Sequence, residues 1–280
     1  MKKISMEYKE LGRTGEKIPV IGMGTWNLSN DIKNEVEALK FGIKKGMRFI
    51  DTAEMYGTEE IVGEAIKDED NVFVATKVSP EHFRYNDVIK ACNASLKRLG
   101  IKQIDLYQLH WPNKFVPIEE TMRAMEKLVK EGKIRYIGVS NFSVEETIAA
   151  QNALKKNEIV SNQVEYSLLA RDIERDLLPF CEKEKITVIA YSPFAQGHLF
   201  DKKYSKLHYE LEKIAKKYNK TMAQVTLNWL ISKKPVVAIP KASDIKHIEE
   251  NAGAVGWKLR KEDFEKIDEI SKKFFRHFWL

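Results

Sequence analysis

Four polar side chains in the first half of the chain could together deliver a proton to an oxygen atom. They are Asp51, Tyr56, Lys77 and His110. A free tyrosine, with a pKa of about 10, is a weak acid near neutral pH, but a neighbouring ammonium group stabilises the tyrosinate. We therefore expect Lys77 to lower the pKa of Tyr56, and Asp51 to keep the buried Lys77 charged and oriented. A neutral His110 could hydrogen-bond the substrate oxygen or relay a proton. Such a set suits protonation of an oxygen that is becoming an alkoxide.

Each of these four residues has an ordinary structural explanation when it is taken alone. An Asp after a strand is often the N-cap of the next helix, a Lys at a strand end is usually solvated, and a lone Tyr or His is more often packed than catalytic. The functional interpretation therefore depends on all four lying together. The six histidines are scattered without a His-x-His or similar cluster, which argues against a metal-dependent barrel hydrolase, and we expect no metal ion.

One rhythm repeats along the chain: a short apolar run, a polar tip, and then an amphipathic stretch of helical period. The apolar runs are Val20–Met23, Arg48–Ile50, Val72–Ala75, Ile104–Leu109, Ile134–Val139, Ile159–Val164, Thr187–Ala190 and Val236–Ile239. The helical stretches are Asn34–Lys45, Glu59–Ile66, Asn86–Leu99, Ile118–Lys130, Val144–Leu154, Ile173–Lys183, Leu207–Tyr218, Met222–Ser232 and Ile245–Asn251. Strands alternating with helices indicate βαβ units and a parallel sheet, and eight units favour a closed (β/α)8 TIM barrel.

Segments outside this rhythm predict additions to the α/β barrel. Tyr8–Leu11 and Lys17–Pro19 flank a short turn and predict an N-terminal β-hairpin that caps the barrel floor. Lys261–Lys273 predicts an extra C-terminal helix, and an aromatic tail, Phe274–Leu280, follows it. No linker or composition shift interrupts the chain, so we expect residues 1–280 to form a single domain.

Composition excludes several classes of protein. Apolar residues make up 43% of the chain and charged residues 31%, as in a globular protein. The net charge is +6, but the 47 basic and 41 acidic residues are interleaved, which argues against nucleic-acid binding. No run of about 18 apolar residues predicts a membrane span. Cys92 and Cys181 are expected to be free thiols, as in the cytoplasm.

Catalytic groups of such a barrel lie at the C-terminal ends of its strands, and here the residues at those ends resemble the aldo-keto reductase family. The matching motifs run in the family's order from about Lys9 to about Glu269. They are Gly22-Met23-Gly24-Thr25-Trp26, Phe49-Ile50-Asp51-Thr52-Ala53-Glu54-Met55-Tyr56-Gly57, Thr76-Lys77, Ile104-Asp105-Leu106-Tyr107-Gln108-Leu109-His110-Trp111-Pro112, Ile137-Gly138-Val139-Ser140-Asn141-Phe142, Asn162-Gln163-Val164-Glu165-Tyr166, Ala190-Tyr191-Ser192-Pro193 and Ile239-Pro240-Lys241. Seven or eight motifs in this order and spacing are highly specific.

The resemblance implies reduction of aldehydes or ketones with NADP(H) and without a metal. In this family Tyr56 would be the general acid, Lys77 its cationic neighbour, Asp51 the partner of Lys77, and His110 the group that orients the carbonyl. Tyr191 would stack on the nicotinamide. The implied cofactor contacts are Thr25, Trp26, Ser140, Asn141, Gln163, Tyr191, Ser192, Lys241, Ala242, Ser243, His247, Glu250 and Asn251.

One residue departs from the family's pattern at the adenosine end of the cofactor. His247 stands where an Arg is usual, and Arg is a permanent, bidentate phosphate ligand whereas His is not. We therefore expect that the enzyme also accepts NAD(H).

Short loops after the fourth strand and after the last helix indicate an open substrate pocket. Its expected wall is Trp26, Met55, Trp111 and Phe115. The tail Phe274–Leu280 could either add to this wall or pack across the outside of the barrel. We expect a small-molecule carbonyl substrate and a monomer. The alternative is a nucleotide-binding regulatory or redox-sensing subunit of the same fold with little turnover.

Overall fold

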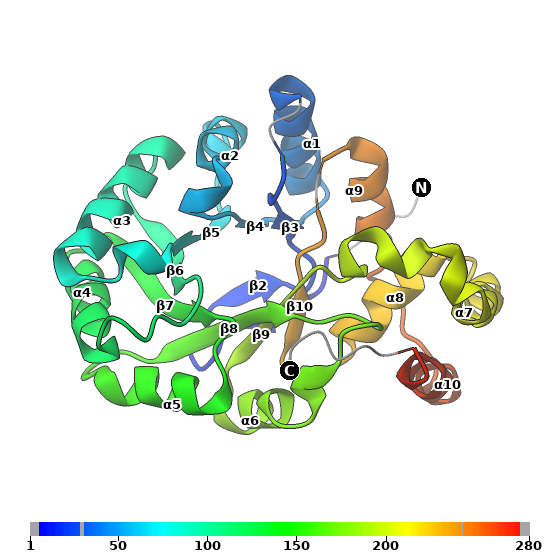
Figure 1. The fold of residues 1–280 in the computed structure, drawn as a ribbon. Coiled ribbons are helices and arrows are strands. Elements are labelled where there is room, and N and C mark those ends of the chain that lie inside the picture. The colour runs from blue at the N-terminus through cyan, green and yellow to red at the C-terminus, as the bar shows by residue number, and fades with distance from the viewer. Residues whose placement is uncertain (1–5, 29–30, 242, 275–280) are drawn as a thin grey trace.

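Eight parallel strands form one sheet in the computed structural model, which describes residues 6–28, 31–241 and 243–274. In sheet order they are β3 (Met23–Gly24), β4 (Phe49–Asp51), β5 (Phe73–Val78), β6 (Ile104–Leu109), β7 (Ile134–Ser140), β8 (Ile159–Glu165), β9 (Thr187–Tyr191) and β10 (Val236–Ala238). Parallel bridges from Ile21 to Ala238 and from Gly24 to Lys241 join the first strand region to the last. The sheet therefore closes into a ring (Figure 1), and the predicted (β/α)8 barrel is confirmed.

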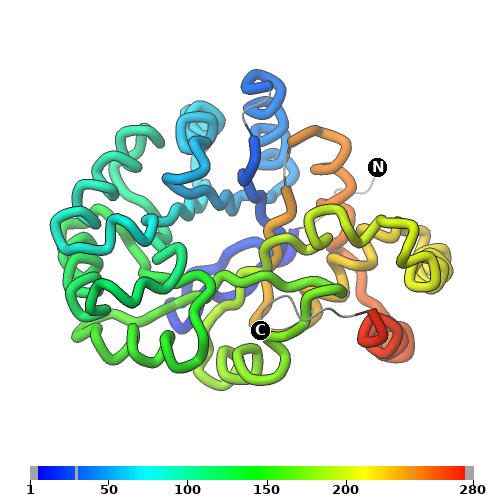
Figure 2. The backbone as a smooth tube through the Cα atoms, in the orientation of Figure 1, coloured from blue at the N-terminus to red at the C-terminus, as the bar shows by residue number. Residues whose placement is uncertain are grey.

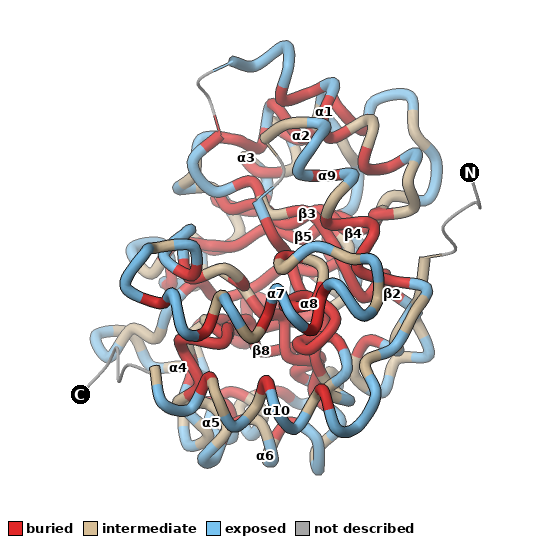
Figure 3. The backbone as a smooth tube through the Cα atoms, turned by 90° about the vertical axis from the view of Figure 1, so that its right-hand side faces the viewer, coloured by how far each residue is buried: buried red, intermediate tan, exposed pale blue. Residues whose placement is uncertain are grey.

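Helices surround this ring on its outside (Figures 1 and 2). They are α1 (Ile32–Lys44), α2 (Glu59–Ile66), α3 (Tyr85–Leu99), α4 (Ile118–Lys130), α5 (Val144–Ala153), α6 (Leu177–Glu184), α7 (Ser205–Tyr218), α8 (Met222–Ile231), α9 (Ile245–Ala252) and α10 (Lys261–Lys272). Their inner faces are buried against the strands or against neighbouring helices, while their outer faces are exposed (Figure 3). Helices α1 and α9 contact each other, which closes the outer layer where the first and last strands meet.

The barrel interior is filled by apolar side chains from its own strands. Phe49, Phe73, Leu106, Val160, Ile189 and Val237 belong to one buried cluster there. Leu11 and Ile18, which come from the N-terminal hairpin, complete this cluster.

That hairpin consists of β1 (Tyr8–Glu10) and β2 (Lys17–Pro19), paired antiparallel as predicted. Its Gly12 donates a backbone hydrogen bond of 2.9 Å to Thr187 at the start of β9. A Cβ on Gly12 would lie 3.0–3.1 Å from atoms of Val160 at the start of β8, so glycine allows the hairpin to fit closely against the strands. The hairpin therefore lies at the N-terminal ends of the strands and leaves their C-terminal ends open for chemistry.

Most predicted element boundaries agree with the structure to within two or three residues, but one helix begins later than predicted. The stretch predicted as one helix from Ile173 divides into a short 3₁₀ helix, Asp172–Glu174, and α6. The carboxylate of Asp176 accepts a hydrogen bond of 2.6 Å from the backbone of Leu177 and starts α6 there. Arg171 binds Glu174 through two nitrogens and fixes the preceding turn. Over the described residues, no helix combines the length and the hydropathy that a membrane span requires.

Candidate active site

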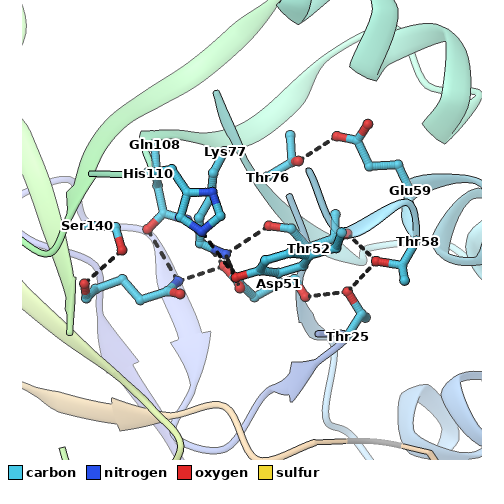
Figure 4. Close-up of polar contacts among 12 residues, drawn as sticks. Thr25, Asp51, Thr52, Thr58, Glu59, Thr76, Lys77, Gln108, His110 and Ser140 are labelled. Atoms are coloured by element: carbon cyan, nitrogen blue, oxygen red, sulfur yellow. Dashed lines mark hydrogen bonds and ion pairs between the residues drawn. The ribbon is translucent and has the colours of Figure 1, made fainter. Parts of the chain in front are cut away.

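The structure brings Asp51, Tyr56, Lys77 and His110 together at the C-terminal ends of neighbouring strands. Asp51 ends β4, Lys77 lies in β5, His110 follows β6, and Tyr56 ends the short 3₁₀ helix Glu54–Tyr56. The ammonium of Lys77 lies 2.5 Å from Oδ1 of Asp51 (Figure 4) and 3.4 Å from the hydroxyl of Tyr56. That hydroxyl lies 3.3 Å from Nε2 of His110. The hydroxyl of Tyr56 is therefore in contact with both a cation and an imidazole.

Lys77 is completely buried, and its three hydrogens all have acceptors. Besides Asp51 and Tyr56, it donates a hydrogen bond of 2.9 Å to the carbonyl of Thr52. Burial, the largest single effect, disfavours the charged form, but the contacts with Asp51 and Tyr56 together outweigh it and raise the pKa of Lys77. The site therefore contains a permanent buried cation.

The pKa of Tyr56 differs from the sequence-based expectation. Burial raises the pKa of Tyr56 above its ordinary value of 10, while the charge of Lys77 opposes that rise and the charge of Asp51 adds to it. The expected effect of Lys77 is present, but burial, which the sequence does not reveal, exceeds it. Tyr56 therefore remains protonated at neutral pH and can act as a proton donor.

His110 is a neutral imidazole in this environment. Burial, with a further contribution from the charge of Lys77, lowers the pKa of His110 to about 2. Its ring is stacked on the indole of Trp111 with 4.0 Å between centroids. Nε2 faces Tyr56, and Nδ1 is buried without a hydrogen-bond partner among the described residues. His110 can therefore offer Nε2 to a substrate oxygen without carrying a charge.

Two side-chain amides hold the second oxygen of Asp51. Gln163 donates to Oδ2 at 2.7 Å and Gln108 donates to it at 3.2 Å. Gln108 was not among the sequence-predicted site residues. The sequence did contain a clue to Gln108. It lies in the predicted strand two residues before His110, and residues two apart in an extended chain point to the same face.

Threonine hydroxyls form a network behind Asp51 (Figure 4). The hydroxyl of Thr58 lies 3.0 Å from that of Thr25 and 2.9 Å from that of Thr52. The hydroxyl of Thr25, predicted from the resemblance to meet the cofactor, donates to the backbone carbonyl of Asp51 at 3.0 Å. This network links β3 to the loop that carries Tyr56.

The residues implied at the nicotinamide form one hydrogen-bonded cluster next to His110. The hydroxyl of Tyr191 donates to Oδ1 of Asn141 at 3.0 Å. Nδ2 of Asn141 lies 3.2 Å from the carbonyl of His110 and 3.1 Å from the hydroxyl of Ser140, which donates to the carbonyl of Gln163. Asn141 is held in a left-handed conformation with φ of 61°. This cluster therefore presents amide, hydroxyl and aromatic groups beside His110.

The residues implied at the adenosine end lie after β10 and along α9. Lys241 and His247 are exposed, Ser243 and Glu250 are half-buried, and Asn251 is buried. Asp244, which sequence reasoning missed, caps α9 by accepting from the backbone of His247, and its Oδ2 also lies 2.5 Å from Nδ1 of His247. Ala242 lies outside the described residues. The imidazole at this position therefore already has a carboxylate partner.

The four residues expected to form the substrate pocket wall are all exposed. Trp111 covers His110, Met55 precedes Tyr56, and Trp26 has 53% of its surface exposed. Phe115, which is 89% exposed, lies on a loop fixed by a hydrogen bond from Asn113 to the carbonyl of Pro80. Of the aromatic tail, only Phe274 is described.

A model of the aldo/keto reductase family matches residues 20–272. This chain belongs to the aldo/keto reductase family.

Individual relatives of this aldo/keto reductase cover nearly its whole length. It is 41% identical to methylglyoxal reductase YeaE of Escherichia coli over 271 residues, which are 94% of this chain and 95% of that protein. It is 39% identical to glyoxal reductase of Bacillus subtilis, with 92% and 91% covered. A crystal structure of an aldo-keto reductase from Klebsiella pneumoniae in complex with NADPH superimposes with a TM-score of 0.88 at 38% identity, covering 98% of this chain and 97% of that one.

Proposed function

We propose that this aldo/keto reductase reduces small aldehydes and ketones to alcohols, with NADP(H) as the hydride donor and Tyr56 as the proton donor. The observation that carries this proposal is the Tyr56 hydroxyl, held 3.4 Å from the ammonium of Lys77 and 3.3 Å from the neutral imidazole of His110. The relatives named as methylglyoxal and glyoxal reductases support the substrate class. Solved neighbours in complex with NADP or NADPH support the cofactor.

Each catalytic side chain has a distinct task in this mechanism. When NADPH is bound, it supplies the hydride that adds to the carbonyl carbon. Nε2 of His110 orients the carbonyl oxygen, and the hydroxyl of Tyr56 donates its proton to that oxygen as negative charge develops there. Lys77 stabilises the resulting tyrosinate, and Asp51 keeps Lys77 in place. In the reverse oxidation, Tyr56 acts as the base.

The cluster around Asn141 fits a nicotinamide. A carboxamide both donates and accepts hydrogen bonds, and Ser140, Asn141 and Gln163 offer matching hydroxyl and amide groups. Tyr191, with its hydroxyl fixed on Asn141, offers an aromatic face for stacking. Thr25 and Trp26 directly follow β3 and Ser192 directly follows β9, and we assign them to the nicotinamide end of the proposed cofactor site.

The adenosine end fits a nucleotide phosphate less tightly. Lys241 offers an exposed cation, and Ser243, Glu250 and Asn251 offer polar groups. The imidazole of His247 is already in contact with the carboxylate of Asp244. A histidine also lacks the permanent charge and the bidentate geometry with which an Arg binds phosphate. We therefore propose that NADP(H) is the main cofactor and that NAD(H) is also accepted.

The exposed apolar side chains of the expected wall support a permissive pocket for small substrates. Trp26, Met55, Trp111 and Phe115 present apolar surface with few polar groups that would select one carbonyl compound.

A steady-state assay tests the function most simply. We expect the protein to oxidise NADPH in the presence of methylglyoxal and of a simple aromatic aldehyde, with NADH turned over more slowly. NADPH binding without turnover on either substrate would instead support the regulatory subunit, an alternative that the complete catalytic set does not favour. A kcat/KM preference for NADPH above about a thousandfold, roughly 4 kcal/mol, would contradict the acceptance of NAD(H).

We further propose that residues 1–280 act as one barrel domain, as a monomer, in the cytoplasm. The four catalytic side chains come from one chain, and Cys92 and Cys181 are buried free thiols, as expected in a reducing compartment. Light scattering at assay concentrations should give a mass near 32.4 kDa. A stable dimer would contradict the monomer, and fractionation of the host cell checks the location.

A further inference from the structure

The carboxylate of Asp51 needs donors that Lys77 does not supply. Asp51 is 2% exposed, so water cannot satisfy its oxygens. Lys77 reaches only Oδ1, and its other two hydrogens go to the carbonyl of Thr52 and to the hydroxyl of Tyr56. Since an ammonium group has three hydrogens, none is left for Oδ2. The second oxygen of Asp51 therefore depends on other side chains.

The amides of Gln108 and Gln163 fill that need. An ionised carboxylate only accepts hydrogen bonds, so the nitrogen of each amide must face Oδ2 of Asp51. Nε2 of Gln163 also lies 3.5 Å from Oε1 of Gln108, which fixes the orientation of the Gln108 amide. Gln108 is completely buried, so its amide has no access to solvent.

We propose that Gln108 is a positioning residue for the proton donor: its amide holds Oδ2 of Asp51, which keeps Oδ1 on Lys77 and Lys77 on Tyr56. This inference rests on the proposed function. There Gln163 also contacts the nicotinamide, whereas among the described residues the amide nitrogen of Gln108 donates only to Asp51. Figure 4 shows Gln108, Asp51 and Lys77 converging inside the barrel.

The packing inside the barrel leaves room for the side chain of Gln108. In the sheet register Gln108 lies between Lys77 of β5 and Gly138 of β7. A Cβ on residue 138 would lie 2.9 Å from Cγ of Gln108 and 2.5 Å from the hydroxyl of Ser161, closer than such atoms approach. The missing side chain at Gly138 therefore leaves the space that Gln108 occupies.

A glutamine at this buried position destabilises the fold unless its amide makes hydrogen bonds. Interior positions of such barrels are mostly filled by branched apolar residues. Leu106, two residues earlier on the same face of β6, follows that apolar rule. The carboxylate of Asp51 explains why position 108 does not.

Loss of the Gln108 amide should change the pKa of Tyr56 through the charge of Asp51. With one donor fewer, the negative charge of Asp51 is less neutralised and its carboxylate is less fixed. That charge raises the pKa of Tyr56, so the hydroxyl should become a weaker acid. The acidity of Tyr56 thus distinguishes positioning from simple packing.

Gln108→Met tests the proposal, because methionine has a similar length and volume but no donor. We expect kcat for carbonyl reduction to fall about 10- to 100-fold, the scale of a hydrogen bond to a charged group. The basic limb of the kcat pH profile should move to higher pH, while KM and the Kd for NADPH stay within about threefold. Gln103→Met is the matched control, since Gln103 donates to the carbonyl of Gly132 away from the site.

Gln108→Glu gives a second readout that does not depend on packing. A glutamate at position 108 repels Asp51 when it is ionised, but donates to Oδ2 when it is protonated. We expect this variant to lose more activity than the methionine variant at pH 8 and to regain part of it as the pH falls towards 5. This recovery remains measurable even if Gln108→Met folds poorly.

Two results would overturn the proposal: a Gln108→Met enzyme with wild-type kcat and an unmoved basic limb, or a Gln108→Glu enzyme whose loss is the same at every pH. Either result, combined with an inactive Tyr56→Phe enzyme, would leave the proposed function intact. Full activity of Tyr56→Phe itself would instead refute the proposed function.

Discussion

Burial disfavours the charged form of all three titrating groups that meet at the Tyr56 hydroxyl. Lys77 stays charged because its contacts with Asp51 and Tyr56 compensate for burial, whereas Tyr56 and His110 are both kept neutral by it. A neutral acid beside a fixed cation suits proton donation, because the cation stabilises the tyrosinate that the reaction forms.

The pH dependence of kcat/KM for reduction follows from these directions. In the proposed mechanism reduction needs protonated Tyr56, so activity should fall only as pH rises through the pKa of Tyr56, which burial raises above its ordinary value. His110, with a pKa of about 2, is already neutral at pH 5 and should add no acidic limb between pH 5 and 8. We expect a flat profile from about pH 6 to 9. A limb near pH 6.5 that disappears in a His110→Gln enzyme would contradict the neutral imidazole.

Residue types and spacing were sufficient to select the four catalytic candidates, since each follows an apolar run. Gln108 was missed because a polar residue inside such a run looks like an interruption of the core until its neighbour across the barrel is known. Asp244 was missed because its contact with His247 depends on the conformation of the helix cap. The direction of the Tyr56 pKa shift was wrong for the same kind of reason, since burial is a property of the folded chain.

Among the elements, the N-terminal hairpin is anchored to the barrel in part by the side chain of Lys9. The ammonium of Lys9 in β1 donates to the carbonyls of Ile231, Lys233 and Val236 at 2.6–2.7 Å. These carbonyls lie at the end of α8 and at the start of β10, so one side chain joins the barrel floor to the last strand. Carbonyls at a helix C-terminus attract cations.

Lys9→Met should weaken this anchor without changing the chemistry. We expect the free energy of unfolding to fall by about 1.5–3 kcal/mol, as for hydrogen bonds to a charged group. Urea denaturation measures this loss, and kcat at 25 °C should be unchanged because the active site lies at the opposite ends of the strands. Lys17→Met, on the exposed side of β2, is the control and should cost less than about 0.5 kcal/mol. Equal stabilities for the two variants would refute the anchor.

Periodicity predicted these elements well where one face is apolar, as in α4 and β6, whose bounds match the structure. It failed at the start of α6, because the turn there is set by Arg171, Glu174 and Asp176 through side-chain hydrogen bonds. Local hydrogen bonds of this kind leave no periodic signal.

At the scale of the whole molecule, the closed barrel is what makes the site. Asp51 and Gln163 are 112 residues apart in sequence, yet they share a hydrogen bond because β4 and β8 face each other across the interior. The count of eight strand–helix units predicted this closure. The side-chain contacts across the interior were not predictable, because they join strands that are far apart in sequence and depend on how those strands pack in the folded barrel.

The central claim is that Tyr56 gives the proton to the carbonyl oxygen. The most direct measurement is single-turnover oxidation of bound NADPH by Tyr56→Phe in the presence of saturating methylglyoxal, with Kd for NADPH measured separately. We predict a rate at least about 100-fold below that of the unaltered enzyme, as for loss of a general acid, with an unchanged Kd. A rate within about threefold of the unaltered enzyme would contradict the claim and require another proton donor.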